Sequence, residues 1–261
     1  MNLEYFIAKR LVTAKSDKSS VSSPIIKIAI TAIAIGVIMM IVSIATGIGL
    51  QKKIQEKVAA FNGHVIISNH DDNQSQVSTV PISTKQNFYP NFKSVTGIKH
   101  IQAVATKAAM IRTETTVEGI IFKGVGSDYN WDNIKEYIVE GTIPTINNKL
   151  TDDVVISKYL ANRLNLKLND ICRTYFIKSG NKGYNLRSFK IVGIFNSGFQ
   201  EFDSSFLIGD LKHIQKINKW DKDEVGAFEI FLNNFKNLFD GYYVRLWWFY
   251  KKKLLRNFLK N

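Results

Sequence analysis

The pattern of hydrophobic and polar positions is dominated by one uninterrupted apolar stretch near the N-terminus. Residues 28–50 are 23 consecutive positions without a charged side chain. At 1.5 Å of rise per residue an α-helix over this stretch spans about 34 Å, enough to cross the hydrocarbon core of a bilayer. The stretch is too long for the apolar part of a typical signal peptide, and no clean small-residue cleavage site follows it. We therefore predict an uncleaved membrane-spanning helix.

This helix is predicted to cover residues 24–61, running past the bilayer into a charged extension. Pro24 suits the first helical position, and Asn62 and Gly63 are typical of a helix end. Residues 1–23 form the remaining N-terminal segment. More basic side chains precede the span than follow it: Lys9, Arg10, Lys15, Lys18 and Lys27 against Lys52, Lys53 and Lys57. The excess predicts a cytoplasmic N-terminus and a translocated main domain.

Small residues recur along one stripe of the span at spacings of about one or two helical turns. They are Ala32, Gly36, Ser43 and Gly47. Such stripes let transmembrane helices approach each other closely, so we predict packing against helices of another chain. The alternative is that glycine and alanine are simply common in membrane spans.

Beyond the span, short apolar runs with strand character alternate with polar turns and two helical patterns. Strands are predicted at 64–69, 98–105, 108–113, 117–125, 154–156, 170–178, 188–195 and 225–232. Helices are predicted at 157–164, with Ser157 as N-cap, and within 206–218, and a short helix or turn at 128–137. The mixture has no strict strand–helix–strand rhythm, which favours one α+β domain over residues 62–240.

The chain is basic, with a formal net charge of +13. A basic chain suggests nucleic acid or an anionic membrane as a partner. Much of the excess lies at the C-terminal end, where residues 241–261 contain six basic side chains and no acidic one. The segment before the span is also rich in lysine, as membrane flanks usually are. With no RNA-binding or zinc-finger signature, we predict a membrane protein that does not bind nucleic acid.

Residue types that carry chemistry are sparse and scattered. Cys172 is the single cysteine and the four histidines are widely spaced, so we predict neither a disulfide within the chain nor a metal site. Gly124 and Gly126 follow a strand, but no complete nucleotide-binding motif is present. Asp152, Asp153 and the acidic cluster at 221–224 lie in turn-like contexts and are expected to be solvated. We predict no catalytic residue and no cofactor.

One aromatic segment stands apart from the predicted strands. Phe195, Phe199 and Phe202 lie at irregular spacing in a loop-like stretch. They are our candidates for an exposed apolar contact with another molecule. The alternative, that these rings pack in the core, is favoured by how often phenylalanine is buried.

Several pieces of the chain together resemble one known family. The N-terminal pieces are residues 4–11, the short stretch 24–27 before the span, and residues 47–67 after it. The later pieces are residues 119–126, 140–144, 155–164 and 189–195. Over about residues 1–238 the chain resembles the permease subunits of lipoprotein-releasing ABC transporters. These are the LolC/LolE-type members of the FtsX-like, MacB-type permease superfamily.

The resemblance implies a fold and a way of working. It implies one N-terminal span followed by a MacB-type periplasmic core domain and three further spans. It also implies an inner-membrane location, a cytoplasmic ATPase subunit and a second permease copy as partners, and lipoprotein as cargo. ATP hydrolysis by the partner would move the periplasmic domain, and the permease itself would not be an enzyme.

The C-terminal end departs from the family pattern. Seven of the 21 residues in 241–261 are aromatic, and no further span follows. We expect a permease truncated before its last three spans, with 241–261 translated out of frame. The competing interpretation of this tail is a basic aromatic segment on an anionic membrane surface. The alternative for the whole chain is a single-pass extracytoplasmic binding or sensor module.

Overall fold

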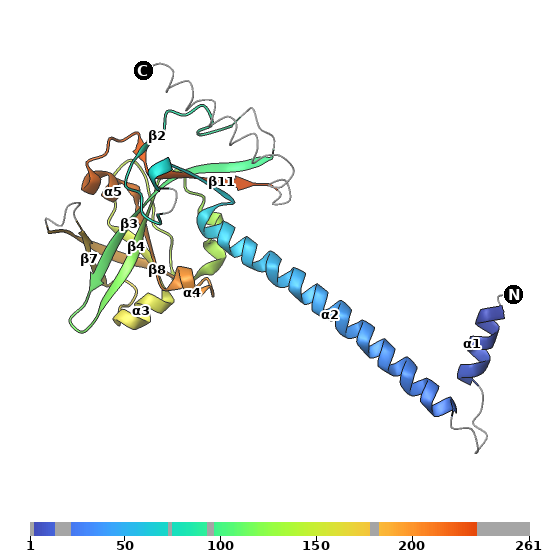
Figure 1. The fold of residues 1–261 in the computed structure, drawn as a ribbon. Coiled ribbons are helices and arrows are strands. Elements are labelled where there is room, and N and C mark those ends of the chain that lie inside the picture. The colour runs from blue at the N-terminus through green and yellow to red at the C-terminus, as the bar shows by residue number, and fades with distance from the viewer. Residues whose placement is uncertain (1–2, 14–21, 73–74, 93–96, 178–182, 234–261) are drawn as a thin grey trace. The chain divides into compact units, whose positions relative to one another are not determined.

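The computed structural model describes residues 3–13, 22–72, 75–92, 97–177 and 183–233 (Figure 1). The chain divides into two compact units, Met1–Glu56 and Lys57–Asn261. The tail at 241–261, for which we predicted an out-of-frame origin, lies outside the described residues. Of the predicted N-terminal segment 1–23, residues 1–2 and 14–21 also lie outside them.

The first unit consists of helix. α1 covers Leu3–Thr13, and α2 covers Ser22–Asn62 and continues into the second unit. Among the described helices, α2 alone is long and apolar enough to cross a membrane. It ends where the sequence predicted, at Asn62, and Gly63 follows with φ +71°, a left-handed conformation that favours glycine at a helix end.

The second unit is an α+β domain, as predicted. Its strands are β1 Val65–Ser68, β2 Ile82–Ser83, β3 Ile98–Arg112, β4 Val117–Val125, β5 Ile138–Gly141, β6 Asp153–Ser157, β7 Ile171–Ile177, β8 Tyr184–Phe195, β9 Phe206–Asp210, β10 Glu224–Val225 and β11 Ala227–Leu232. Its α-helices are α3 Lys158–Leu164, α4 Gln200–Asp203 and α5 Leu211–Asn218. Single 3-10 turns are η1 His70–Asp72, η2 Trp131–Asn133 and η3 Lys135–Tyr137.

Six strands of the main sheet close into a ring. The order β3-β4-β9-β6-β8 is completed by β7, which pairs with both β8 and β3. β11 and then β1 extend the sheet from β3, and β5 pairs with β8. The small β2–β10 sheet is separate. The ring is mixed, because β4–β9 and β6–β8 are parallel pairs and the other ring pairs are antiparallel.

Two apolar clusters fill the domain. The larger one contains the rings of Phe122, Phe176 and Phe189, which contact one another from β4, β7 and β8. The smaller one is built around Phe61, from the last turn of α2. α5 packs on β3 and β4, where the lack of a side chain at Gly124 lets the backbone of Leu211 approach closely.

Several elements differ from the sequence prediction, β3 and β9 among them. β3 is one continuous strand where two were predicted, because its pairing with β4 runs without a break from Val104 to Arg112. Lys107, in the middle, is largely buried and donates a 2.6 Å hydrogen bond to Asn218. The helix predicted within 206–218 is present as Leu211–Asn218, and the strand before it was not predicted: residues 206–210 pair with β4 as a parallel strand. Asp210 ends that strand and caps α5 through the Lys212 amide.

Candidate functional site

The most highly organised part of the domain is the place where α2 ends on the sheet. Phe61, 2% exposed, inserts its ring between three others. The ring centroids lie 5.6 Å from Tyr137, 5.5 Å from Phe195 and 5.1 Å from Phe202. Because aromatic rings bury a large apolar area, this contact attaches the last turn of α2 firmly to the domain.

Two of the three phenylalanines predicted to form an exposed contact belong to this cluster. Phe195 is fully buried and Phe202 is 6% exposed, so neither presents its ring to solvent. The prediction of an exposed contact is therefore wrong for these two, because their rings pack against Phe61. Phe199 is half-buried against Phe202, and a contact with another molecule through it stays a prediction.

The backbone leaves α2 through a tight turn into β1. The Gly63 amide donates to the Ala59 carbonyl at 2.8 Å, and the His64 amide donates to the Ile230 carbonyl at 2.8 Å. A Cβ at Gly63 would lie 3.1 Å from the Cβ of Glu229. Helix end and β11 are therefore in close contact, and glycine provides both the conformation and the space.

A buried charged pair lies beneath this turn. The Lys123 ammonium on β4 donates to the Phe61 carbonyl and to Glu229 Oε1 on β11, the latter at 2.5 Å. The two side chains are only 2% and 3% exposed. Gln102 Nε2 donates to the other carboxylate oxygen at 2.8 Å, and Lys123 Nζ lies 5.8 Å from the Tyr129 ring centroid. Each charge is thus compensated by direct partners, which a buried charge requires.

The pair also sets the local electrostatics. Burial, and then the negative charge of Glu229, raise the pKa of the Tyr129 phenol well above its usual value, so this side chain is neutral at physiological pH. Positive charge at Lys123 lies at the carbonyl end of α2, where the helix dipole favours a cation. The arrangement is an electrostatic cap for the end of the long helix.

Sequence reasoning missed Lys123, Glu229 and Gln102. The available signal was a charged side chain in the middle of an otherwise apolar strand: Lys123 within 120–125 and Glu229 within 227–232. Because charged residues are almost never fully buried without a partner, two such positions on neighbouring elements indicate a buried pair.

A lysine on α2 makes a further contact. Lys57 Nζ donates to the Ser197 carbonyl at 2.8 Å, in the loop between β8 and α4. This loop is held by Asp203, whose carboxylate accepts hydrogen bonds from the Ser197 amide, the Ser197 hydroxyl and the Gly198 amide at 2.8–3.1 Å. The helix end is therefore attached on two sides, at the sheet and at this loop.

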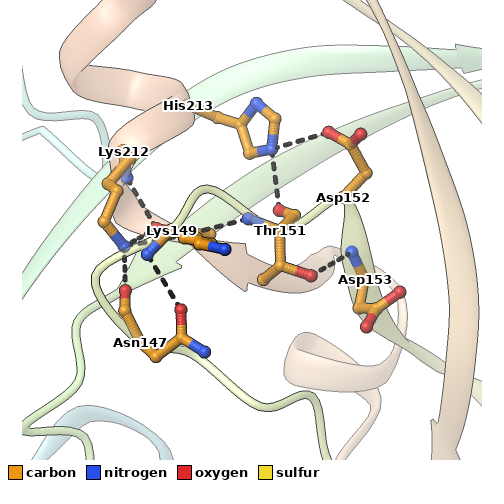
Figure 2. A network of polar contacts seen from close by, with 8 residues as sticks. Asn147, Lys149, Thr151, Asp152, Asp153, Lys212 and His213 are labelled. Atoms are coloured by element: carbon orange, nitrogen blue, oxygen red, sulfur yellow. Dashed lines mark hydrogen bonds and ion pairs between the residues drawn. The ribbon is translucent and has the colours of Figure 1, made fainter.

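A second polar network fastens the segment before β6 to α5 (Figure 2). His213 Nε2 lies 3.0 Å from the Thr151 carbonyl and 3.2 Å from Asp152 Oδ1. Lys212 Nζ donates to the Asn147 carbonyl at 2.6 Å and contacts Asp210 at 3.1 Å. Asp152 is exposed, as predicted for a turn carboxylate. Within the described residues, no group of three or more histidine, cysteine or acidic side chains could hold a metal ion.

The small-residue stripe lies on the exposed surface of α2. Ala32, Gly36, Ser43 and Gly47 are all exposed, and neither glycine has a neighbouring atom within 4 Å of a built Cβ. Their role in packing against another helix stays a prediction.

One exposed apolar surface of the domain lies on the outer face of β3, β7 and β8. Met110, Tyr175 and Leu186 stand side by side across these strands, and the Tyr175 and Tyr184 rings are 5.1 Å apart. The outward positions described on these strands carry no carboxylate: Ala108, Met110, Arg112, Ile171, Arg173, Tyr175, Ile177, Tyr184, Leu186, Ser188 and Lys190. This face was not singled out from the sequence, because its pattern is that of any half-buried strand.

A helix long and apolar enough to cross a membrane runs directly into an α+β sheet domain. The profile of the family described as MacB-like periplasmic core domain matches residues 28–232. The chain therefore belongs to this family, and its resemblance to LolC/MacB-type permeases is confirmed.

Two curated relatives agree with this assignment. The chain is 22% identical over 216 residues to the lipoprotein-releasing system transmembrane protein LolC of Buchnera aphidicola subsp. Acyrthosiphon pisum, covering 80% of this chain and 50% of that one. A second LolC, from Buchnera aphidicola subsp. Schizaphis graminum, is 23% identical over 217 residues, with 80% and 51% covered. The chain spans about half the length of the curated relatives it matches.

Two solved structures are similar to part of the domain. The extracellular domain of the noncanonic ABC-type transporter YknZ from Gram-positive bacteria has a TM-score of 0.43 and 16% identity, over 65% of this chain and 82% of that one. The periplasmic region of MacB from Actinobacillus actinomycetemcomitans has a TM-score of 0.42 and 13% identity, over 65% and 73%.

Proposed function

We propose that this chain acts as the permease component of an ABC transporter that releases lipoproteins from the inner membrane. A cytoplasmic ATPase subunit hydrolyses ATP, and the resulting motion reaches the periplasmic domain through α2. The N-terminus lies in the cytoplasm and the domain in the periplasm. A second permease copy contributes the helices that pack against the stripe of small residues.

The observation that supports this proposal best is the continuity between the span and the domain. α2 is one helix from Ser22 to Asn62, and its last turn is attached to the sheet by Phe61, Lys123 and Lys57. A sensor that only binds a ligand gains nothing from so firm an attachment. A subunit that passes motion from membrane to domain requires it.

The proposal assigns no catalytic role to the charged groups at the helix end or to Cys172. The charged groups at the helix end are buried in pairs, and Cys172 is fully buried with its pKa raised by that burial to about 11, which disfavours the reactive thiolate. In the proposal, chemical work is done by the ATPase partner and the chain supplies motion.

Reconstitution tests the proposal directly. The chain is combined with its ATPase and the other permease components in proteoliposomes carrying a fluorescently labelled lipoprotein. ATP-dependent release of the lipoprotein is expected only when the chain is present. Unchanged release without the chain would contradict the proposal, and stable binding of a soluble ligand by the chain alone would favour a sensor module.

Orientation has a separate test. In spheroplasts, externally added protease is expected to digest the domain and to leave the N-terminal segment protected. The opposite pattern would reverse the proposed topology.

A further inference from the structure

Three elements of the second unit meet at one ammonium group. Lys123 extends from β4, its first hydrogen bond reaches the Phe61 carbonyl at the end of α2, and its second reaches Glu229 on β11. The Tyr129 ring lies on a further side. A lysine has three N–H donors, and the carbonyls of a last helical turn have no partner within the helix. The end of α2 is therefore capped by a side chain from a distant strand.

Stability alone is a weak reason for such a pair. Desolvation of two charges offsets much of their attraction, and apolar replacements of a buried pair are often as stable. The geometry has another consequence, which an apolar core would not provide. A hydrogen bond from a charged donor has a direction and a short range, so it fixes the position of the Phe61 carbonyl relative to β4 and β11.

We propose that Lys123 is a positioning residue that fixes the end of α2 on the sheet, so that displacement of the helix end is passed to β4 and β11. Only the part of the inference that concerns transport, namely that motion of α2 moves the domain, rests on the proposed function. The positioning itself is a property of this chain and is testable without a transporter.

A displacement of the α2 end can reach the sheet through two strands, β4 and β11. β4 and β11 both pair with β3, on its opposite sides. A displaced helix end pulls on Lys123 and through Glu229 on β11, and the His64–Ile230 hydrogen bond acts on the same strand. The aromatic contact of Phe61 resists separation, but it is less directional. Because Lys123 is part of β4 and is bonded to both the helix end and β11, a small shift of the helix end displaces both strands.

Amide hydrogen exchange on the full chain in lipid nanodiscs measures this attachment. The reporters are the amides of Gly63 and His64, each in a 2.8 Å hydrogen bond at the end of α2. Amides of β7 within the ring report global opening. The comparison is between Glu229→Gln and the double variant Lys123→Met with Glu229→Gln. Both have a neutral residue at position 229 that can still accept from Gln102, and they differ only at Lys123.

Glu229→Gln is expected to lower the melting temperature. The ratio of the amide exchange rate at residues 63–64 to the rate in β7 is expected to stay as in the unsubstituted chain. The double variant is expected to raise that ratio by about tenfold or more, in line with a lost hydrogen bond from a charged donor. Lys107→Met is the matched control, because Lys107 is also largely buried but contacts Asn218 instead of α2. It is expected to leave the ratio unchanged.

An equal ratio in Glu229→Gln and in the double variant would overturn the inference. So would faster exchange of both regions in proportion, which would mean that Lys123 acts on global stability only. The double variant is also tested for lipoprotein release. Loss of release with intact ATP hydrolysis would extend the positioning role to transport. Normal release despite faster local exchange would count against the proposed transport mechanism and leave the assignment of Lys123 standing.

Discussion

The ring of Phe61, in the last turn of α2, stacks on the ring of Phe202 in α4, with centroids 5.1 Å apart and planes inclined by 20°. The two residues are 141 positions apart in the sequence. The contact therefore joins the last turn of the long apolar helix α2 to the short helix α4. It makes the helix end part of the folded core.

Phe61→Ala is expected to destabilise the domain by about 3–5 kcal/mol, because it removes a buried ring and leaves a cavity among three others. Chemical unfolding of the full chain in mild detergent, followed by near-ultraviolet circular dichroism, measures the loss. Phe199→Ala is the control, since its ring is only half-buried, and it is expected to cost clearly less. Equal losses would contradict the central place of Phe61 in this cluster.

Two glycines of β4 make a matched pair for the packing of α5. A Cβ at Gly124 would lie 2.8 Å from the Leu211 Cα, whereas a Cβ at Gly119 meets no atom within 4 Å. Gly124→Ala is expected to cost about 1–3 kcal/mol, because backbone must move to relieve the overlap. Gly119→Ala is expected to be neutral or slightly stabilising. A neutral result at Gly124 would mean that α5 is free to shift away from β4.

His213 predicts a dependence of stability on pH. Burial lowers its pKa; hydrogen bonding to the Thr151 carbonyl and the charges of Asp152 and Asp210 raise it in part, and Arg187 lowers it further. Its Nε2 faces the Thr151 carbonyl, while its buried Nδ1 has no hydrogen-bond partner among the described residues. The neutral form with the proton on Nε2 satisfies this geometry, and a second proton on Nδ1 would have no acceptor.

The sign of the pH effect follows from the lowered pKa. Below pH 6.5, the ordinary histidine value, the unfolded chain binds a proton that the folded chain does not, so stability is full above 6.5 and is lost as the pH falls toward the folded pKa. The free energy of unfolding is expected to decrease between pH 7 and pH 5, and to decrease less steeply in His213→Gln. His70→Gln, at an exposed side chain, should leave the slope unchanged. A slope unaffected at His213 would refute this assignment.

The stripe of small residues predicts a dependence of assembly on Gly36. Gly36→Leu adds a large side chain where helices are proposed to approach, and it is expected to reduce co-purification with the partner permease by severalfold. Folding of the chain itself should not change, because Gly36 has no neighbouring atom within 4 Å. Val37→Leu, one position off the stripe, is the control. Unchanged assembly with Gly36→Leu would remove the packing argument.

Local patterns predicted the elements whose signals lie close together in the sequence. The helix end at Asn62, the strand at 117–125 and the N-cap at Ser157 all depend on a few neighbouring residues, and all are present. The strand at 206–210 was missed because its residues form a strand only by pairing with β4, some 85 positions away. Parallel pairing of this kind leaves no short-range signal.

The site was harder to predict for the same reason. Phe195, Phe199 and Phe202 were singled out from the sequence as an exposed contact. Phe61, which packs on Phe195 and Phe202, is far away in the sequence, so the burial of these two rings could not be seen. Lys123 and Glu229 are 106 positions apart and come together only once β4 and β11 lie on either side of β3. Each charge stands among apolar residues in the sequence, a signal that our sequence analysis did not use, and only the fold brings the two together as a pair.

The double pairing of β7 has a mechanical consequence. Because β7 is hydrogen-bonded to β3 on one side and to β8 on the other, the six strands form a hoop. No strand of a hoop can be peeled away without breaking its hydrogen bonds to two neighbouring strands at once. Tension applied to any strand is therefore shared by the strands on both of its sides. In single-molecule pulling, such a domain is expected to yield in one abrupt step at high force instead of unravelling strand by strand. Below that force the ring is expected to keep its shape, which is what the proposed transport motion would require of the domain.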